Sequence, residues 1–171
     1  STRNTFQKLK ELFPIDGEVE DLIQRKRTLF NDAFDNKEDL YLIEGVEKLI
    51  QDLHRNGMLL ILASSAAKVT IERVFKRFNL HQYFTHIVSG EDFPNSKPHP
   101  AIFEYAASLS SAPKENCVVI EDSTNGIRAA KAAEIFCIGY NSENSKLQDL
   151  SLADVVVENL DDLSFDRISK Y

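Results

Sequence analysis

The stretch VVIEDSTNGIRAA, residues 118–130, decides the fold that this chain is expected to adopt. Three consecutive β-branched apolar residues, Val118–Ile120, predict a short buried strand. The alanine-rich segment Ile127–Ala133 predicts a helix soon after it, and two adjacent carboxylates, Glu121 and Asp122, lie between the two. A buried strand that leads at once into a helix is the repeating unit of a parallel sheet.

The same alternation continues on both sides of this stretch. Apolar runs predict further strands at residues 58–63, 86–88, 136–140 and 154–157. Helical periodicity predicts helices at residues 46–55, 69–78 and 101–109, and a last weak helix at residues 160–168. This pattern predicts an α/β fold, a Rossmannoid parallel sheet with helices on both faces and right-handed crossovers.

The first 40 residues differ from the rest because they show only helical periodicity. The turn Pro14–Gly17 separates two amphipathic segments there. We therefore expect two parts, a helical unit at residues 1–40 and an α/β core at residues 41–171.

Composition excludes several classes of partner. A net charge of −7 argues against a binder of nucleic acid, which needs a basic face. The longest apolar run, Met58–Ala63, is far shorter than the ~20 residues that span a membrane, which predicts a soluble protein with no membrane contact. Two cysteines, Cys117 and Cys137, lie at or inside apolar runs as expected of buried free thiols, which fits the reducing cytoplasm.

Polar residues follow three of the predicted strands, at the edge where ligands of such sheets bind. Ser64 and Ser65 follow the first strand, Lys97 lies in the loop Ser89–Pro98 after the second, and Glu121 and Asp122 follow the third. Ser64 with the next backbone N–H groups is suited to an anion, although serine is also a favoured helix N-cap, and the two roles are compatible.

Lys97 and the two acids allow both a chemical and a structural interpretation. Prolines after Lys97 stiffen its loop, so its ammonium can neutralise a phosphoryl group, whereas most loop lysines are merely solvated. Glu121 and Asp122 suit Mg²⁺, or else cap the following helix. The four histidines show no ligand spacing, so zinc is not expected.

Three motifs together resemble the haloacid dehalogenase superfamily, in its branch with β-phosphoglucomutase and phosphoglycolate phosphatase. They are Leu62–Ser65, the run Ser96–Pro100 with Ile102-Phe103, and above all Val118–Ala130. The resemblance covers residues 44–157, and residues 1–40 look like the later part of the small helical cap of that branch. It implies that Ser64 and Ser65 bind the phosphoryl group, that Lys97 pairs with it, and that Asp122 with Glu121 holds Mg²⁺. Arg3 is implied as a contact between cap and substrate.

The chain departs from that family in lacking its first motif. Family members carry an Asp-x-Asp after a central strand, which supplies the nucleophile and the acid, and no such motif precedes the cap here. Asp161-Asp162 follows no buried strand. Without the central strand, its two neighbours would hold unpaired backbone groups that each cost about 1–3 kcal/mol. We therefore expect a longer native N-terminus, or another chain that completes the sheet. The family glycine near Ala133-Glu134 is also missing.

These observations predict an enzyme, a Mg²⁺-dependent phosphatase of small phosphorylated metabolites of the phosphosugar or phosphoglycolate type. It would work through an aspartyl-phosphate in the intact protein, and the present chain would be inactive alone. A β-phosphoglucomutase-like mutase is one alternative. The other, which the missing motif favours, is a non-catalytic remnant that binds phosphate or a protein.

Overall fold

The computed structural model describes residues 2–143 and 147–171, and the chain divides into two compact units at Tyr41/Leu42. Unit 1 is a pair of packed helices, α1 (Thr2–Leu12) and α2 (Val19–Asn36). The connection between them turns at Gly17, whose φ of +92° lies in the left-handed region that favours glycine. Lys10 Nζ donates a hydrogen bond to the Gly17 carbonyl and so ties the turn to α1.

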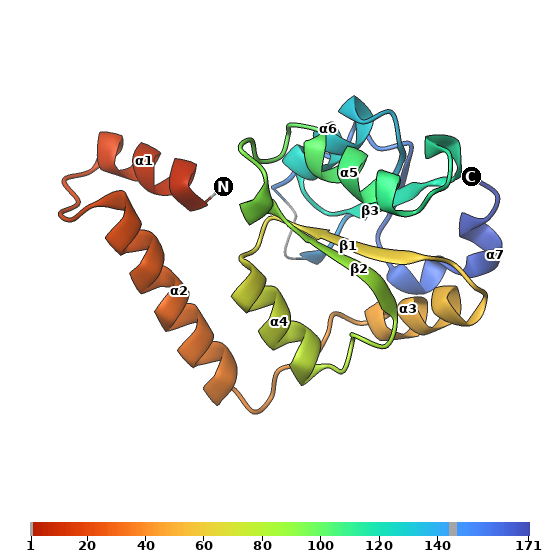
Figure 1. Ribbon diagram of the computed structural model, residues 1–171, viewed down its shortest axis with the longest axis horizontal. Coiled ribbons are helices and arrows are strands. Elements are labelled where there is room, and N and C mark those ends of the chain that lie inside the picture. Colours follow the sequence, from red (N-terminus) through yellow and green to blue (C-terminus); the bar gives the residue numbers. More distant parts are fainter. Residues whose placement is uncertain (1, 144–146) are drawn as a thin grey trace. The chain divides into compact units, whose positions relative to one another are not determined.

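Unit 2 is an α/β core, which confirms the predicted fold class. Its parallel strands are β1 (Leu60–Ser64), β2 (Phe84–Ser89), β3 (Val118–Glu121), β4 (Phe136–Tyr140) and β5 (Val155–Val157). Its helices are α3 (Val46–Arg55), α4 (Lys68–Arg77), α5 (Ala101–Leu109), α6 (Thr124–Ala132) and α7 (Phe165–Ile168), with 3-10 turns η1 (Gly90–Asp92), η2 (Lys114–Asn116) and η4 (Leu160–Asp162). Figure 1 shows α5 and α6 on one face of the strands and α3 and α4 on the other.

Several predicted elements differ from the structure in extent, and two of them are informative. The first strand starts two residues later than predicted, at Leu60. It ends one residue later, at Ser64, because Ser64 pairs in register with Ser89 of β2. The single helix predicted at residues 160–168 is wrong. The short turn η4 ends at Asp162, and Ser164 begins α7 by accepting a hydrogen bond from Arg167 N.

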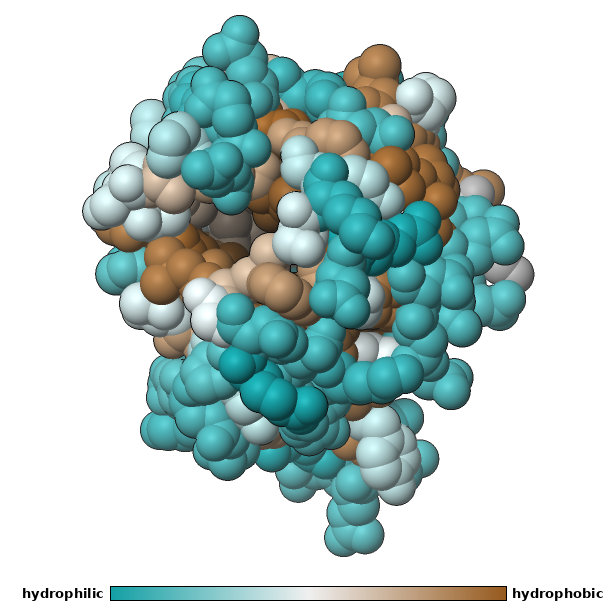
Figure 2. Space-filling model, turned by 90° about the vertical axis from the view of Figure 1, so that its right-hand side faces the viewer, coloured by the Kyte–Doolittle hydropathy of each residue, from teal (hydrophilic) through white to brown (hydrophobic). Residues whose placement is uncertain are grey.

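The strands form two separate sheets, β1-β2 and β3-β4-β5. No residue of β1 or β3 is buried, whereas the three middle residues of β4 are. A cavity of about 630 Å³ lies between the sheets, lined by residues of both β1 and β3 and by apolar side chains of α3 and α5. Figure 2, viewed from the side where β1 begins, shows a hollow bordered by hydrophobic surface. β1 and β3, which the resemblance places on either side of a central strand, therefore face this cavity, called the slot below.

Apolar clusters on the two faces hold the helices to the strands. One cluster joins α5 and α6 to the sheets through residues such as Phe103, Ile127 and Cys137. Another joins α3 and α7 to β4 through Leu53, Ile138 and Ile168. Among the helices within residues 2–143 and 147–171, none is both long and apolar enough to cross a membrane.

The Asp154 carboxylate holds the start of β4, and we expect its contribution to the free energy of unfolding to depend on pH. Its carboxylate accepts hydrogen bonds from Cys137 N at 2.8 Å and from Lys131 Nζ at 2.7 Å. Burial alone would raise the pKa of Asp154, but Lys131 and the Cys137 amide lower it below its usual value. The stabilisation is then present above about pH 4 and is lost as pH falls further. We expect Asp154→Asn to cost about 1 kcal/mol in urea unfolding at pH 7 and less at pH 3, where protonation has begun to remove the stabilisation. An equal loss at both pH values would contradict this account.

Candidate active site

Lys97 lies at the centre of the polar residues beyond the strand ends. It is in the loop between η1 and α5, whose N-cap is Pro100, and only 9% of its side chain is exposed. Its Nζ donates to Glu121 Oε1 at 2.6 Å and to the carbonyl of Ala63 at 3.1 Å. The ammonium thus bridges the carboxyl ends of β1 and β3, which no ladder connects.

One aromatic ring, that of Phe103, also lies against this ammonium. The Phe103 ring, on the first turn of α5, has its centroid 4.4 Å from Lys97 Nζ. Phe103 is itself 5% exposed. A cation over the face of an aromatic ring is attracted by the quadrupole of the ring, so Phe103 helps to hold the charge in place.

Glu121 is the most heavily bonded carboxylate of the site. While Oε1 accepts from Lys97, Oε2 accepts from Asp122 N at 2.9 Å, Ser123 N at 2.9 Å and Ser123 Oγ at 3.0 Å. Burial alone would raise the pKa of Glu121, but the charge and hydrogen bond of Lys97, with the Ser123 bonds, lower it below its usual value. Glu121 is therefore a fixed anion that shapes the loop after β3.

Gly126 makes room for that anion. A Cβ at this position would lie 1.9 Å from the carboxyl carbon of Glu121. Ser123 is the N-cap of α6, with its Oγ accepting from Gly126 N at 3.0 Å. The alternative in which Glu121 or Asp122 caps this helix is therefore wrong.

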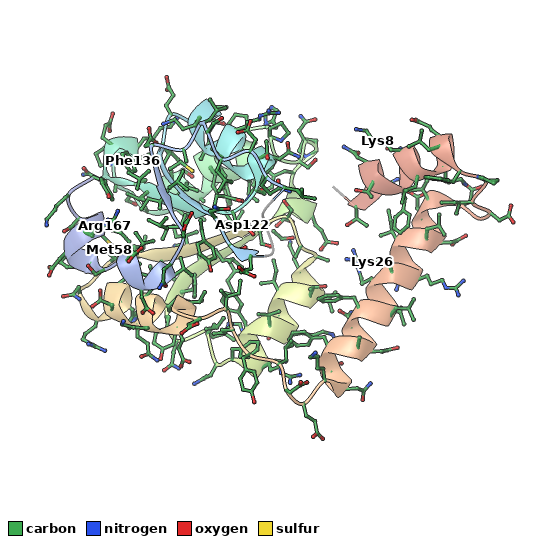
Figure 3. All side chains as sticks on the ribbon, turned by 180° about the vertical axis from the view of Figure 1, so that it is seen from behind. Lys8, Lys26, Met58, Asp122, Phe136 and Arg167 are labelled. Carbon is green, nitrogen blue, oxygen red and sulfur yellow. The ribbon has the colours of Figure 1, made fainter. Side chains whose placement is uncertain are left out.

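Asp122 is the more open of the two acids. Figure 3 shows it at the opposite end of the strands from Met58 and Phe136, which lie at their amino ends. Partial burial and then the negative charge of Glu121 raise the pKa of Asp122 above its usual value. A bound cation would counteract the raised pKa by stabilising the carboxylate, so the position is suited to one.

Ser64 and Ser65 lie where the chain leaves β1. Ser64 Oγ accepts a hydrogen bond from Ala66 N at 3.1 Å, and Ser65 is exposed. The following helix α4 begins at Lys68 with Ala67 as its N-cap, so Ser64 is not the cap that its residue type suggested. The carboxylate of Glu91 accepts from Lys68 N at 2.8 Å and occupies the start of that helix.

Arg3 lies in unit 1, on α1, and pairs with Glu20 of α2. Both side chains are more than half exposed. This ion pair joins the two helices of unit 1, and the role of Arg3 toward a substrate stays a prediction.

The donor set fits Mg²⁺ in part. Among the residues that the structure describes, no group of three or more His, Cys, Asp or Glu side chains could hold a metal. Mg²⁺ does not need such a group, because it is commonly bound by one or two carboxylates, several waters and a substrate phosphate. Asp122 meets this requirement as a direct ligand, whereas both oxygens of Glu121 are already hydrogen-bonded.

Two residues of this site could not be assigned a role from sequence. The apolar spacing of α5 marks Phe103 only as a core residue, and nothing in it indicates a contact with a loop lysine. Gly126 lies within the motif Val118–Ala130, but its steric role depends on the position of the Glu121 carboxylate, which the sequence does not give.

Two phosphatases match most of this chain in sequence. It is 32% identical to hexitol phosphatase B of Escherichia coli strain K12 over 124 residues, 72% of the chain and 56% of that protein. It is 28% identical to phosphoglycolate phosphatase of Salmonella typhi over 167 residues, 94% of the chain and 66% of that protein. The chain thus spans less than two thirds of the length of either relative.

A solved structure and a family model match the chain as well. The β-phosphoglucomutase of Clostridium difficile superposes with a TM-score of 0.83 at 24% identity, over 99% of this chain and 76% of that structure. The sequence matches the family model of haloacid dehalogenase-like hydrolases over residues 1–140. This chain therefore belongs to the haloacid dehalogenase-like hydrolase family.

Proposed function

We propose that the whole protein is a phosphatase of small phosphate esters, of the phosphosugar or phosphoglycolate type. The observation that carries the proposal is the ammonium of Lys97, almost fully buried and fixed beside the carboxyl ends of β1 and β3. A preorganised positive charge of this kind stabilises the charge that develops on a phosphoryl group during transfer. The two phosphatase relatives described above support the choice of reaction.

Each proposed site residue then has a role at one phosphoryl group. Ser64 Oγ, which accepts from Ala66 N, donates its own hydroxyl hydrogen to one oxygen of that group, with Ser65 contributing from the exposed side. Lys97 neutralises its charge. Arg3 contacts the substrate from the cap.

Mg²⁺ is the proposed cofactor, with Asp122 as its direct ligand. When bound, the ion supplies Lewis-acid neutralisation of the phosphoryl oxygens. Glu121 contributes its negative charge at short range while it keeps Lys97 and the loop after β3 in position.

The nucleophile is proposed to come from polypeptide outside residues 1–171. An aspartate carboxylate would attack phosphorus to give an aspartyl-phosphate, which water then hydrolyses. The slot between β1 and β3 supports this source, because a strand that filled it would end next to Lys97. We propose the native segment before residue 1 as the supplier, and supply by another chain is the competing outcome.

Two other functions remain as alternatives. A mutase is favoured by fold likenesses to β-phosphoglucomutases, at 24% and 26% identity. A non-catalytic remnant that binds phosphate or a protein would fit if no segment brings a nucleophile. We also propose a cytoplasmic location, which the two free cysteines support.

Phosphate release by a longer native product tests the proposal, with Asp122→Asn as the informative variant. We expect hydrolysis of phosphosugars or phosphoglycolate that depends on Mg²⁺. Asp122→Asn should lower kcat/KM by about 100-fold or more, because metal stabilisation is worth several kcal/mol and each 1.36 kcal/mol is tenfold. Asp166→Asn, an exposed aspartate on α7, is the matched control and should retain activity.

Each of the other results identifies a different function. Isomerisation of glucose 1-phosphate without free phosphate would favour the mutase. Binding of phosphate with no turnover of any ester would favour the remnant. Unchanged Mg²⁺ dependence in Asp122→Asn would overturn the metal role of Asp122.

A further inference from the structure

Ser89, the last residue of β2, carries the most deeply buried hydroxyl near the proposed phosphate turn. The residue is 1% exposed. Its Oγ donates to the carbonyl of Ala66 at 2.8 Å and accepts from Glu91 N at 3.2 Å. One side chain thus ties the turn after β1 to the turn η1 after β2.

Gly90, the next residue, packs directly against the same turn. A Cβ added at Gly90 would lie 3.1 Å from Ser65 Cα and 3.4 Å from the Ser64 carbonyl oxygen. The backbone of η1 therefore approaches the Ser64–Ser65 backbone as closely as a residue without a side chain allows. Any larger residue would press on the turn itself.

These contacts act on the same turn whose preceding residue, Ala63, contacts Lys97. Ser64 immediately follows Ala63, whose carbonyl is 3.1 Å from Lys97 Nζ. The turn is thus fixed on one side by Lys97 and on the other by Ser89 and Gly90. A phosphoryl group that contacts both Ser64 and Lys97 needs this spacing to persist when the site is empty, since reorganisation would weaken binding.

We infer that Ser89 and Gly90 are positioning residues, which hold the Ser64–Ser65 turn in the conformation that binds a phosphoryl group. This inference rests on the proposed function of Ser64. Neither residue is assigned a contact with the phosphoryl group itself. Their effect should therefore appear in the affinity for phosphate beyond any loss of stability.

Ser110 offers a matched control for Ser89. Its Oγ also donates to a backbone carbonyl, that of Ala107 at 2.7 Å, and accepts from a backbone amide, Ala112 N at 3.1 Å. It ends α5, its Oγ also lies 3.8 Å from Cys117 Sγ, and none of these hydrogen bonds reaches the Ser64–Ser65 turn. Ser110→Ala thus removes the same pair of hydrogen bonds elsewhere in unit 2.

The test is a calorimetric titration of inorganic phosphate into the longer native product and its variants. We expect Ser89→Ala to raise the Kd about tenfold, the equivalent of one lost hydrogen bond, and Ser110→Ala to leave it unchanged. Gly90→Ala should also raise the Kd although it removes no hydrogen bond. Urea unfolding of each variant shows that the protein is folded, and Ser64→Ala gives the Kd expected when the turn contributes nothing.

The outcomes separate this inference from the proposed function. The positioning role alone would be overturned if Ser89→Ala, Gly90→Ala and Ser110→Ala all kept the Kd of the unsubstituted protein while Ser64→Ala bound phosphate more weakly. An unchanged Kd in Ser64→Ala would overturn the phosphate site and this inference with it. A raised Kd in both Ser89→Ala and Gly90→Ala, with an unchanged Ser110→Ala, would support both.

Discussion

Replacement of Lys97 by methionine is expected to lower the free energy of unfolding by about 3–5 kcal/mol at pH 7. Methionine keeps most of the apolar volume of the lysine stem but removes the ammonium. Glu121, with 11% of its side chain exposed, would then keep a buried charge without its cation. Breaking a buried pair from one side is costly for this reason. Urea unfolding followed by circular dichroism measures the change.

Lys131→Met is the matched control for this prediction. Lys131 Nζ and Asp154 Oδ2 are 2.7 Å apart, close to the 2.6 Å between Lys97 and Glu121, but about a third of each control side chain is exposed. We expect this variant to lose about 1 kcal/mol or less. In Lys97→Met with Glu121→Gln, part of the loss should be recovered, because no uncompensated charge remains. Similar losses in Lys97→Met and Lys131→Met would show that burial does not matter at this pair.

The order of strands and helices in unit 2 could be predicted because each strand is a short apolar run bounded by turn residues. Val118–Ile120 is an example, since its apolar run stops at two acids, the first of which ends β3. The ends of elements were less predictable. Ser64 belongs to β1 through its pairing with Ser89, which is a property of the neighbouring strand rather than of the local sequence.

The end of α6 departs from the glycine that the resemblance predicts near Ala133-Glu134. Glu134 follows the helix with a φ of +60°, the left-handed region in which glycine is favoured. The absence of glycine there is visible in the sequence, but the strained conformation is visible only in the structure.

The site could be predicted only as far as the strand ends. Ser64, Lys97 and Glu121 stand out because polar residues directly follow or lie between buried strands. Their actual partners are set by tertiary contacts over 24 and 34 residues of sequence, such as Lys97 with Glu121 and with the Ala63 carbonyl. No periodicity encodes such contacts, and for that reason Phe103, Ser89 and Gly126 had no predicted role.

The edges of β1 and β3 that face the slot predict a large change in amide hydrogen exchange when the slot is filled. In a parallel strand, one residue directs both its N–H and its C=O to the same side, and the next residue directs them to the other. The Ala63 carbonyl reaches Lys97, which lines the cavity with Ala63. We therefore expect the amides of Ile61 and Ala63 to face the slot, and that of Leu62 to face β2, with which it pairs.

Filling the slot should slow exchange of the Ile61 and Ala63 amides by about 100-fold or more, because each would gain a partner strand in the core. Exchange measured by NMR would compare residues 1–171 with the proposed longer protein, with Leu62 as the internal control that should change much less. Protection that appears only as protein concentration rises would mean that another chain supplies the strand. Fast exchange at Ile61 and Ala63 in the longer protein at every concentration would contradict the filling of the slot, and with it the proposed route by which a nucleophile reaches Lys97.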